Sequence, residues 1–401
     1  MRTGNRGKTR GKPMIKKKLR KILLCSLYGR SGMLHYSSQL ANSLVKELGS
    51  KVKVHVLLPD YSDGSLFDKR IKLTRVKAPP NVVKTALLTI NPLHFRGLIR
   101  KIRNIDPDII HFVDNHPWYL VLLKSFKDKR FFVTQHEITP HLGELIRGKM
   151  TIFVNRILNR RADKVIVLGE KLKKDLLAQQ KLDPGKILVF LMGDFTFYLK
   201  WNNKRIIEEP HTILFFGRIL HYKGLDTLLK AMPIIKKDVP DIKLVIAGEG
   251  DLEPYKKLIT PGISGNLEII NKYIPEPEVP LYFQRSSIIV MPYRDASSSG
   301  IVPIAYAFRK ALICTDVGCL DEFIDNKKTG ILIRPEDEKA LAKAVVSLLK
   351  DKARRDTLGE SGYKKMMADL SWGSIAKRLS AEYNNVIEES DESRSKRGVR
   401  P

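Results

Sequence analysis

Short apolar segments alternate with amphipathic segments along this chain, and the whole pattern occurs twice. The apolar segments have the length of β-strands, and those of the first series are residues 22–27, 52–58, 109–113, 131–134 and 165–168. Those of the second series are residues 213–216, 244–247, 267–270, 288–291, 311–314 and 331–333. Helical patterns separate them, for example at 37–48, 225–235 and 338–350. The alternation predicts an α/β fold with two Rossmann-like, doubly wound parallel sheets that face a common cleft.

The length of 401 residues suits two domains of ordinary size. We predict a first domain over residues 21–195 and a second domain over 211–373. The stretch 196–210 looks polar and has no clear period, so it is predicted to be the linker. A further helix is predicted over 374–388. The basic segment 1–20 and the polar segment 389–401 are predicted to be disordered tails.

The net charge of +29 calls for an acidic partner: nucleic acid, an anionic membrane surface or a phosphorylated substrate. Part of this charge lies in the first 21 residues, which contain no acidic residue. A second basic stretch, residues 84–103, is amphipathic. It could meet an anionic membrane, or it could be a solvated basic face.

The cysteines argue against a disulfide framework or a zinc site, because Cys25, Cys314 and Cys319 show no paired spacing. They fit a reducing, cytoplasmic compartment. No apolar run approaches the roughly 20 residues that span a bilayer, so any membrane association should be peripheral, on the inner face. Asp106-Pro107-Asp108 looks like a turn before a strand, and we expect neither a metal nor a cofactor.

Two loops of the second series could hold a phosphate. The strand 213–216 is followed by Arg218 and Lys223, which places two cations at the carboxyl end of a strand. Ser299, Gly300 and Ile301 begin a helix after the strand 288–291, and free backbone N–H groups at such a helix start bind phosphate. Each loop alone could be ordinary, either two surface cations or a capped helix. Together they predict a site for a diphosphate.

The first series offers a glycine turn and a histidine. Gly29 and Gly32 follow the first strand but do not make G-x-G-x-x-G, which argues against a nicotinamide dehydrogenase. Close approach of a ligand to the backbone is expected at Gly32. His136, beside Glu137 at a strand end, could orient a hydroxyl or accept a proton. His111 lies among apolar residues and is expected to be structural.

These segments together resemble the retaining glycosyltransferases of family 4 (glycosyl transferases group 1), which have the GT-B fold. The resemblance covers about residues 20–375. It rests on an ordered set of motifs, namely Gly29-Arg30-Ser31-Gly32-Met33, Asp108-Ile109-Ile110-His111, Thr134-Gln135-His136-Glu137, Ala162 to Gly169, Gly217-Arg218 with Lys223-Gly224, Ile246-Ala247-Gly248-Glu249-Gly250, and Thr315 to Glu322.

The resemblance implies a nucleotide-sugar donor bound mainly to the second domain. The base would meet the backbone near residues 272–274, including Ile274, and Glu322 would contribute to donor binding. The diphosphate would lie against Arg218, Lys223 and residues 299–301. Gly32 and His136 would surround the sugar and the acceptor, which would be a glycan or a lipid-linked sugar. The catalytic set would then be His136, Arg218 and Lys223. The family also suggests that the helix 374–388 crosses back to the first domain.

One departure from the family concerns two glutamates, spaced E-x7-E around the glycine that begins the helix. Ser297 and Ala305 occupy their positions here. In the family the first contacts the donor sugar and the second holds the ribose, so this chain must bind its donor with less help from carboxylates.

Two other functions remain open on the sequence. A nucleotide-sugar epimerase could use the same two-domain fold. A non-catalytic nucleic-acid-binding protein could account for the charge, although no aromatic platform or binding module is recognisable and no specific nucleic-acid partner is expected.

Overall fold

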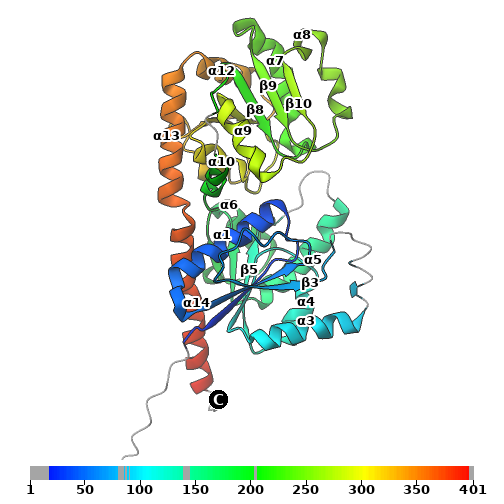
Figure 1. Cartoon of the computed structure of the whole chain (residues 1–401), viewed down its shortest axis with the longest axis vertical. Coiled ribbons are helices and arrows are strands. Elements are labelled where there is room, and N and C mark those ends of the chain that lie inside the picture. The colour runs from blue at the N-terminus through cyan, green and yellow to red at the C-terminus, as the bar shows by residue number, and fades with distance from the viewer. Residues whose placement is uncertain are drawn as a thin grey trace, which may run out of the picture.

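The computed structural model describes residues 18–79, 85, 88–89, 91–138, 145–202 and 206–396. It consists of two lobes, drawn one above the other in Figure 1, each built on one parallel sheet. This is the two-domain α/β architecture that the alternating pattern predicts. The predicted tail 1–20, apart from its last three residues, lies outside the described residues.

The first sheet has seven strands in the order β3-β2-β1-β4-β5-β6-β7. In register, Leu24 of β1 lies opposite Val56 of β2 and His111 of β4. The central strands are buried because helices cover both faces of a parallel sheet. The strands are β1 (Lys21–Cys25), β2 (Lys53–Pro59), β3 (Lys72–Val76), β4 (Ile109–Phe112), β5 (Arg130–Gln135), β6 (Lys164–Val167) and β7 (Ile187–Val189).

The second sheet has six strands in the order β10-β9-β8-β11-β12-β13. The two faces of its central strand β8 pack into separate apolar clusters. Leu214 lies in one cluster, and Ile213 and Phe215 lie in the other. The strands are β8 (Thr212–Phe216), β9 (Lys243–Ala247), β10 (Leu267–Ile270), β11 (Ile288–Met291), β12 (Ala311–Thr315) and β13 (Ile331–Ile333).

The strand order reverses once in each sheet, between β1 and β4 and between β8 and β11. At such a point the loops that follow the two neighbouring strands run to opposite faces of the sheet and leave a crevice, which is where open α/β sheets bind ligands. The topology therefore offers one crevice at the carboxyl edge of each sheet.

Helices cover the sheets of both lobes. Those of the first lobe are α1 (Ser31–Leu48), α3 (Pro92–Ile105), α4 (Tyr119–Ser125), α5 (Leu145–Arg161) and α6 (Glu170–Gln179). Those of the second are α7 (Leu225–Asp238), α8 (Pro261–Ser264), α9 (Val279–Arg285), α10 (Ile301–Ala307), α11 (Leu320–Phe323), α12 (Glu338–Leu349) and α13 (Lys352–Asp369).

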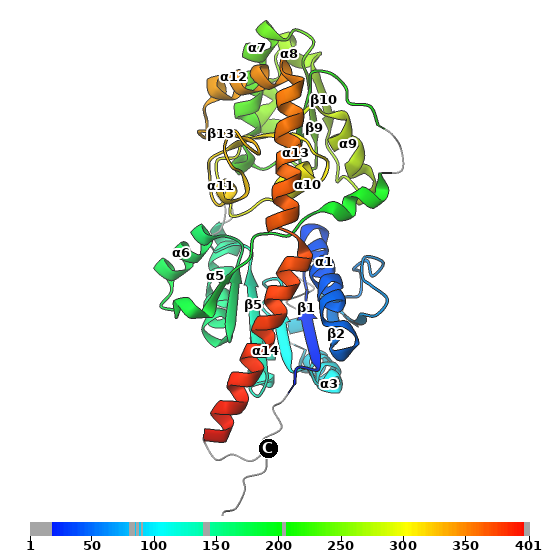
Figure 2. The ribbon, with the colours of Figure 1, turned by 90° about the vertical axis from the view of Figure 1, so that its left-hand side faces the viewer.

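The last helix, α14 (Trp372–Lys396), follows the second lobe in the sequence but packs on the first lobe. Figure 2 shows α13 along the upper lobe and α14 along the lower one. One side of α14 lies in the core of the first lobe, through Trp372, Ile375, Ala376, Leu379, Tyr383, Val386 and Ile387. The prediction of a disordered tail from residue 389 was wrong for 389–396, because the helix continues to Lys396. Ser390 is still buried there, and its hydroxyl donates a hydrogen bond to the carbonyl oxygen of Ile387.

The stretch between the two sheets is neither wholly polar nor structureless, which corrects the sequence-based description of it. Residues Thr196–Trp201 form a 3-10 helix, η3. Phe195 and Tyr198 are buried in the core of the second lobe, and the ring of Phe197 stacks on His35 of α1. The aromatic side chains pack against α10 and give this connection a fixed place between the lobes.

Candidate active site

The loop after β8 is shaped by two glycines. Gly217 has a φ of +101°, and a Cβ atom there would lie 2.8 Å from Nζ of Lys223. Gly224 has a φ of +67°, and its Cβ would lie 1.9 Å from the carbonyl oxygen of Pro292, in the loop after β11. Only glycine accommodates both the left-handed backbone and this close approach. The two loops beside the second crevice are therefore in direct contact.

Lys223 is buried at this crevice, and none of the described carboxylates neutralises it. Lys223 is the last residue of a short 3-10 helix, η4 (His221–Lys223), and it is 8% exposed. No carboxylate of the described residues pairs with it, and its ammonium lies 5.2 Å from the centre of the Tyr293 ring. Burial, and to a smaller extent the charge of Arg218, lowers the pKa of Lys223 to about 7. A buried unpaired cation is costly, and a bound anion would remove that cost.

Arg218 is exposed at the start of the same loop. It lies near enough to Lys223 to affect its pKa, so the structure brings together the two cations that the sequence predicts as a pair. Two like charges in one loop repel each other until an anion binds between or beside them. This arrangement favours a ligand that carries more than one negative charge.

The start of α10 completes the second crevice. The N–H groups of Ser299 and Gly300 have no acceptor among the described residues, and the first turn of the helix contains no acidic side chain. The N–H of Ile301, however, donates to Oγ of Ser299 at 3.2 Å. The prediction that all three amides face a ligand is therefore wrong for Ile301 in this state. The hydroxyl of Ser299, one residue before the N-cap Gly300, takes that amide.

Tyr293 is a side chain of this crevice that sequence reasoning missed. It is 3% exposed, and its hydroxyl has no hydrogen-bond partner within the part of the chain that the structure describes. Oγ of Thr315 donates to its carbonyl oxygen at 2.6 Å and fixes the backbone. The signal available in the sequence was an aromatic residue directly after a strand and a proline.

A half-buried ion pair connects the two loops of the second crevice. The guanidinium of Arg294 donates to both oxygens of Asp226, at 2.8 and 2.5 Å, and to the carbonyl oxygen of His221 at 3.0 Å. Its backbone N–H donates to the carbonyl oxygen of Tyr222 at 2.7 Å. Bidentate pairing of this kind fixes geometry as well as adding energy. Arg294 thus joins the loop after β11 to the loop after β8.

Asp114, which was not predicted as a site residue, connects two elements in a similar way at the first crevice. Its carboxylate accepts hydrogen bonds from the Ser26 hydroxyl at 3.2 Å, from the Tyr28 backbone N–H at 2.8 Å and from the Tyr119 hydroxyl. Burial raises the pKa of Asp114 to about 6. The carboxylate ties the loop after β1 to the end of β4. Gly32, at the start of α1, has no atom within 4 Å of where a Cβ would lie, so open space is left beside that helix start.

His136 lies at the end of β5, and only one of its two ring nitrogens has a hydrogen-bond partner among the described residues. Nε2 lies 2.8 Å from the carbonyl oxygen of Val113 and must carry the hydrogen, because a carbonyl only accepts. Nδ1 therefore keeps its lone pair, and it is buried with no partner among the described residues. Burial lowers the pKa of His136, so the ring is neutral. It can accept a hydrogen bond from a hydroxyl but is a poor proton donor.

His111 is structural, as its apolar surroundings predict. Nδ1 lies 2.6 Å from the Tyr383 hydroxyl of α14, and Nε2 lies 2.8 Å from the Thr134 hydroxyl of β5. Burial lowers the pKa of His111 to about 3, so it stays neutral. The ring links α14 to the sheet of the first lobe.

Glu322 does not face a ligand, which corrects its predicted place among the donor-binding residues. Its carboxylate accepts hydrogen bonds from the N–H groups of Glu170 at 2.7 Å and Lys171 at 2.9 Å, at the start of α6. A carboxylate at a helix start is stabilised by the free amides and by the helix dipole. Glu322 comes from the second lobe and α6 from the first, so this contact joins the lobes.

Ile274 follows β10, and its side chain is buried in the core of the second lobe. Its side chain is therefore not available to a ligand, and contact of a base with its backbone stays a prediction. The two positions at which the family has glutamates are also enclosed. Ser297 is buried, and Ala305 lies wholly within the core on α10.

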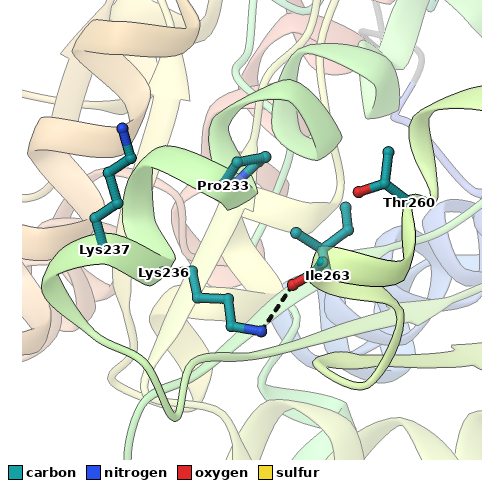
Figure 3. A pocket seen from close by; sticks show the side chains of 6 residues that line it. Pro233, Lys236, Lys237, Thr260 and Ile263 are labelled. Atoms are coloured by element: carbon teal, nitrogen blue, oxygen red, sulfur yellow. Dashed lines mark hydrogen bonds between the residues drawn. The ribbon is translucent and has the colours of Figure 1, made fainter.

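A surface pocket of about 260 Å³ lies elsewhere, between α7 and α8 (Figure 3). Within it Nζ of Lys236 donates to the carbonyl oxygen of Gly262 at 2.7 Å. The pocket is next to the last turn of α7, whereas the second crevice is next to the first turn. It is therefore not part of the candidate site.

The described residues contain no group of three or more histidine, cysteine, aspartate or glutamate side chains placed to hold a metal ion. Among their helices, none combines the length and the apolar composition needed to cross a membrane.

Two family models match this chain one after the other. Residues 31–193 match Glycosyltransferase Family 4, and residues 200–365 match Glycosyl transferases group 1. Together they cover both lobes.

Curated relatives are distant in sequence. An uncharacterised glycosyltransferase of Methanocaldococcus jannaschii, MJ1607, is 25% identical over 237 residues, which are 56% of this chain and 60% of that protein. The capsular polysaccharide biosynthesis glycosyltransferase CapM of Staphylococcus aureus is 25% identical over 246 residues, 57% of this chain and 63% of that one. The chain thus spans about three fifths of the length of these relatives.

Solved structures share the fold over nearly the whole chain. Sucrose-phosphate synthase from Thermosynechococcus elongatus superposes with a TM-score of 0.74 at 20% identity, covering 92% of this chain and 99% of that one. Anabaena HepE in complex with UDP-glucose gives 0.68 at 15% identity, covering 90% and 98%. The chain therefore belongs to the family 4 glycosyltransferases, and its two lobes are the two domains of the GT-B fold.

Proposed function

We propose that this protein transfers a sugar from a nucleotide-sugar donor to an acceptor. The observation that carries the proposal is Lys223, a buried ammonium without an anionic partner among the described residues, at the crevice of the second domain. Arg218 lies on the same loop, and the neighbouring loop carries the amides of Ser299 and Gly300, which have no acceptor within the described part of the chain. A diphosphate satisfies all of these groups at once. The solved complex of HepE with UDP-glucose supports a donor of this class.

The proposed chemistry needs charge compensation more than a protein nucleophile. The bond from the anomeric carbon to the phosphate oxygen breaks, a bond to the acceptor oxygen forms, and the acceptor proton passes to the leaving diphosphate. Lys223 and Arg218 stabilise the charge that develops on that diphosphate. Departure and attack on the same face of the sugar would give retention. Since two side-chain cations supply the positive charge, we propose that no metal is required.

His136 is assigned to the sugar. With Nε2–H donated to Val113, the lone pair on Nδ1 can accept a hydrogen bond from a hydroxyl of the donor sugar or the acceptor. Gly32 leaves room for such a ligand beside the start of α1. These two residues belong to the first domain, so closure of the cleft would complete the site and exclude water.

The acceptor is proposed to be a glycan or a lipid-linked sugar, with the enzyme in the cytoplasm. Helix α3 supports a peripheral place on the inner face of the membrane. Its charged side chains Arg96, Arg100 and Arg103 are exposed, and Leu93 beside them is 68% exposed. Exposed basic and apolar groups on one helix suit an anionic bilayer surface.

Sedimentation with liposomes tests this membrane proposal. We expect binding to vesicles that contain phosphatidylglycerol, weaker binding at high salt, and none to vesicles of phosphatidylcholine alone. Replacing Arg96, Arg100 and Arg103 by glutamine should reduce the bound fraction severalfold, because each basic side chain near an anionic surface contributes about 1 kcal/mol. Equal binding of the triple variant would remove α3 from the membrane proposal.

The transfer reaction itself is tested by incubating the protein with UDP-, GDP- and ADP-sugars, with and without candidate acceptors, and identifying the products. We expect a nucleoside diphosphate and a glycosylated acceptor in equal amounts. If the donor is instead converted to a nucleotide with an epimeric sugar when no acceptor is present, the protein is an epimerase.

A further inference from the structure

The ring of His136 packs against the ring of Tyr36, which belongs to α1. The two ring centres lie 4.7 Å apart, and the ring planes meet edge to face at 83°. Tyr36 is 4% exposed and His136 is 8% exposed, so the contact lies inside the first domain. The hydrogen bond from Nε2 to Val113 holds only one end of the imidazole. A packed neighbour is needed to fix the plane of the ring as well.

Trp372, the first residue of α14, is the second aromatic neighbour of Tyr36. The centres of these two rings lie 5.1 Å apart, and their planes meet at 76°. Helix α14 packs along α1, so this contact belongs to a longer interface between the two helices (Figure 2). Tyr36 therefore meets both His136 and Trp372 edge to face, which is a favoured arrangement of aromatic rings.

Asp194 fixes Trp372 at the place where the chain passes between the domains. The backbone N–H of Trp372 donates to the carboxylate of Asp194 at 3.1 Å, and the indole N–H donates to its carbonyl oxygen at 2.7 Å. The N–H of Asp194 donates to the carbonyl oxygen of Leu370 at 2.7 Å, which joins the two segments that connect the domains. A Cβ atom on Gly193 would lie 2.3 Å from the Trp372 ring, so the indole has little room to move.

A second set of contacts runs from α14 to β5 just before His136. The Thr134 hydroxyl lies 2.8 Å from Nε2 of His111, and Nδ1 of His111 lies 2.6 Å from the Tyr383 hydroxyl. Burial raises the pKa of Tyr36 to about 12, and the Thr134 hydroxyl opposes part of this rise, so the phenol stays protonated. Helix α14 thus supports the carboxyl end of β5 through two sets of side chains.

We propose that Tyr36 is a positioning residue for His136, which holds the imidazole plane so that Nδ1 faces the hydroxyl of the substrate. The inference rests on the proposed function, because that function assigns His136 to a hydroxyl of the sugar or the acceptor. Tyr36 acts through His136 and not by touching the substrate. Its contact with Trp372 makes the orientation of His136 depend on the connection between the domains.

Nitrogen NMR of the full-length protein with isotope-labelled histidine tests the positioning, because the two ring nitrogens differ in each tautomer. The His136 signals are identified by their loss in His136→Gln. We expect a single tautomer in the wild type, with the hydrogen on Nε2. Tyr36→Leu keeps an apolar side chain but removes the ring, and its His136 signals should broaden or show both tautomers. Tyr36→Phe keeps the ring and should give the wild-type signals.

Turnover of the best donor is the second readout. Tyr36→Leu should lower kcat about tenfold, because a misplaced contact to the reacting groups slows the reaction. The affinity for a nucleoside diphosphate should stay unchanged, since Arg218 and Lys223 belong to the other domain. Tyr36→Phe should restore most of the lost kcat.

The matched control is Phe126→Leu, which removes a buried ring from the same core. Phe126 lies close to the start of β5, whereas His136 follows its end, so the control should keep the wild-type His136 signals and kcat. Wild-type His136 signals in Tyr36→Leu, or the same changes in Phe126→Leu, would overturn the inference alone. If the wild type binds no nucleoside diphosphate and transfers no sugar, the proposed function fails, and the NMR signals still decide whether Tyr36 fixes His136.

Discussion

Among single residues, Lys223 has the largest expected effect on diphosphate binding, through its protonation. Its pKa of about 7 in the ligand-free protein means that the ammonium is half deprotonated near neutrality. A bound diphosphate stabilises the charged form and raises that pKa again, so binding above pH 7 must take up a proton. The affinity for a nucleoside diphosphate should therefore fall as the pH rises, by about fivefold between pH 7 and pH 8.

Calorimetry in buffers of different ionisation enthalpy measures both the affinity and the proton uptake. Lys223→Met is the comparison, because it removes the titrating group and leaves the titration of the ligand itself. We expect the variant to bind weakly, without proton uptake at pH 8. A wild type with the same pH dependence as Lys223→Met would show that Lys223 does not pair with the diphosphate.

Residue types at strand ends allowed part of this site to be predicted. The motif after β8 identified Arg218 and Lys223, and a helix start after a serine-rich loop identified Ser299 and Gly300. The absence of a hydrogen-bond partner for the Tyr293 hydroxyl among the described residues could not be predicted, because it depends on packing between loops that are distant in sequence. The partners of Glu322 could not be predicted for the same reason, since they are backbone amides of α6.

At the scale of elements, Glu322 caps α6 across the cleft. Glu322→Ala removes a carboxylate from two helix amides, and we expect the free energy of unfolding of the first domain to fall by about 1 kcal/mol. The affinity for a nucleoside diphosphate should change little, because the carboxylate faces the other domain. Urea denaturation followed by far-UV circular dichroism measures the first effect, and calorimetry measures the second. If the free energy of unfolding is unchanged and the affinity for the nucleoside diphosphate falls strongly, Glu322 is a donor-binding residue.

Elements with a strong apolar pattern were predictable, and those decided by tertiary contacts were not. The central strands are continuous apolar runs because both faces of the sheet are covered. Strands such as β1 and β8 could therefore be predicted from the sequence. The edge strands β3 and β7 were missed, because their side chains are mostly half-exposed and their sequences show little alternation. Helix α1 begins at Ser31, before the predicted residue 37, since the loop that Asp114 holds is short.

At the scale of the whole molecule, the two domains meet through a few polar contacts and one shared helix. Glu322 joins the domains at α6, and His35 joins them at Glu276. Helix α14 begins where the chain leaves the second domain and packs along α1 of the first. Trp372 is held there by Asp194, whose carbonyl oxygen accepts from the indole N–H at 2.7 Å. These contacts connect the two domains, each of which has its crevice at the carboxyl edge of its own sheet.

The most direct test of the central claim, that the two cations of the loop after β8 hold the departing diphosphate, is the turnover of the best donor by Arg218→Ala and Lys223→Ala. Lys236→Ala, a lysine of the pocket in Figure 3, is the control. We expect each of the two site variants to lose at least about a hundredfold in kcat, because loss of a charge-stabilising group typically costs about 10²–10³, and we expect the control to keep wild-type turnover. Near-normal kcat in both site variants would contradict the claim.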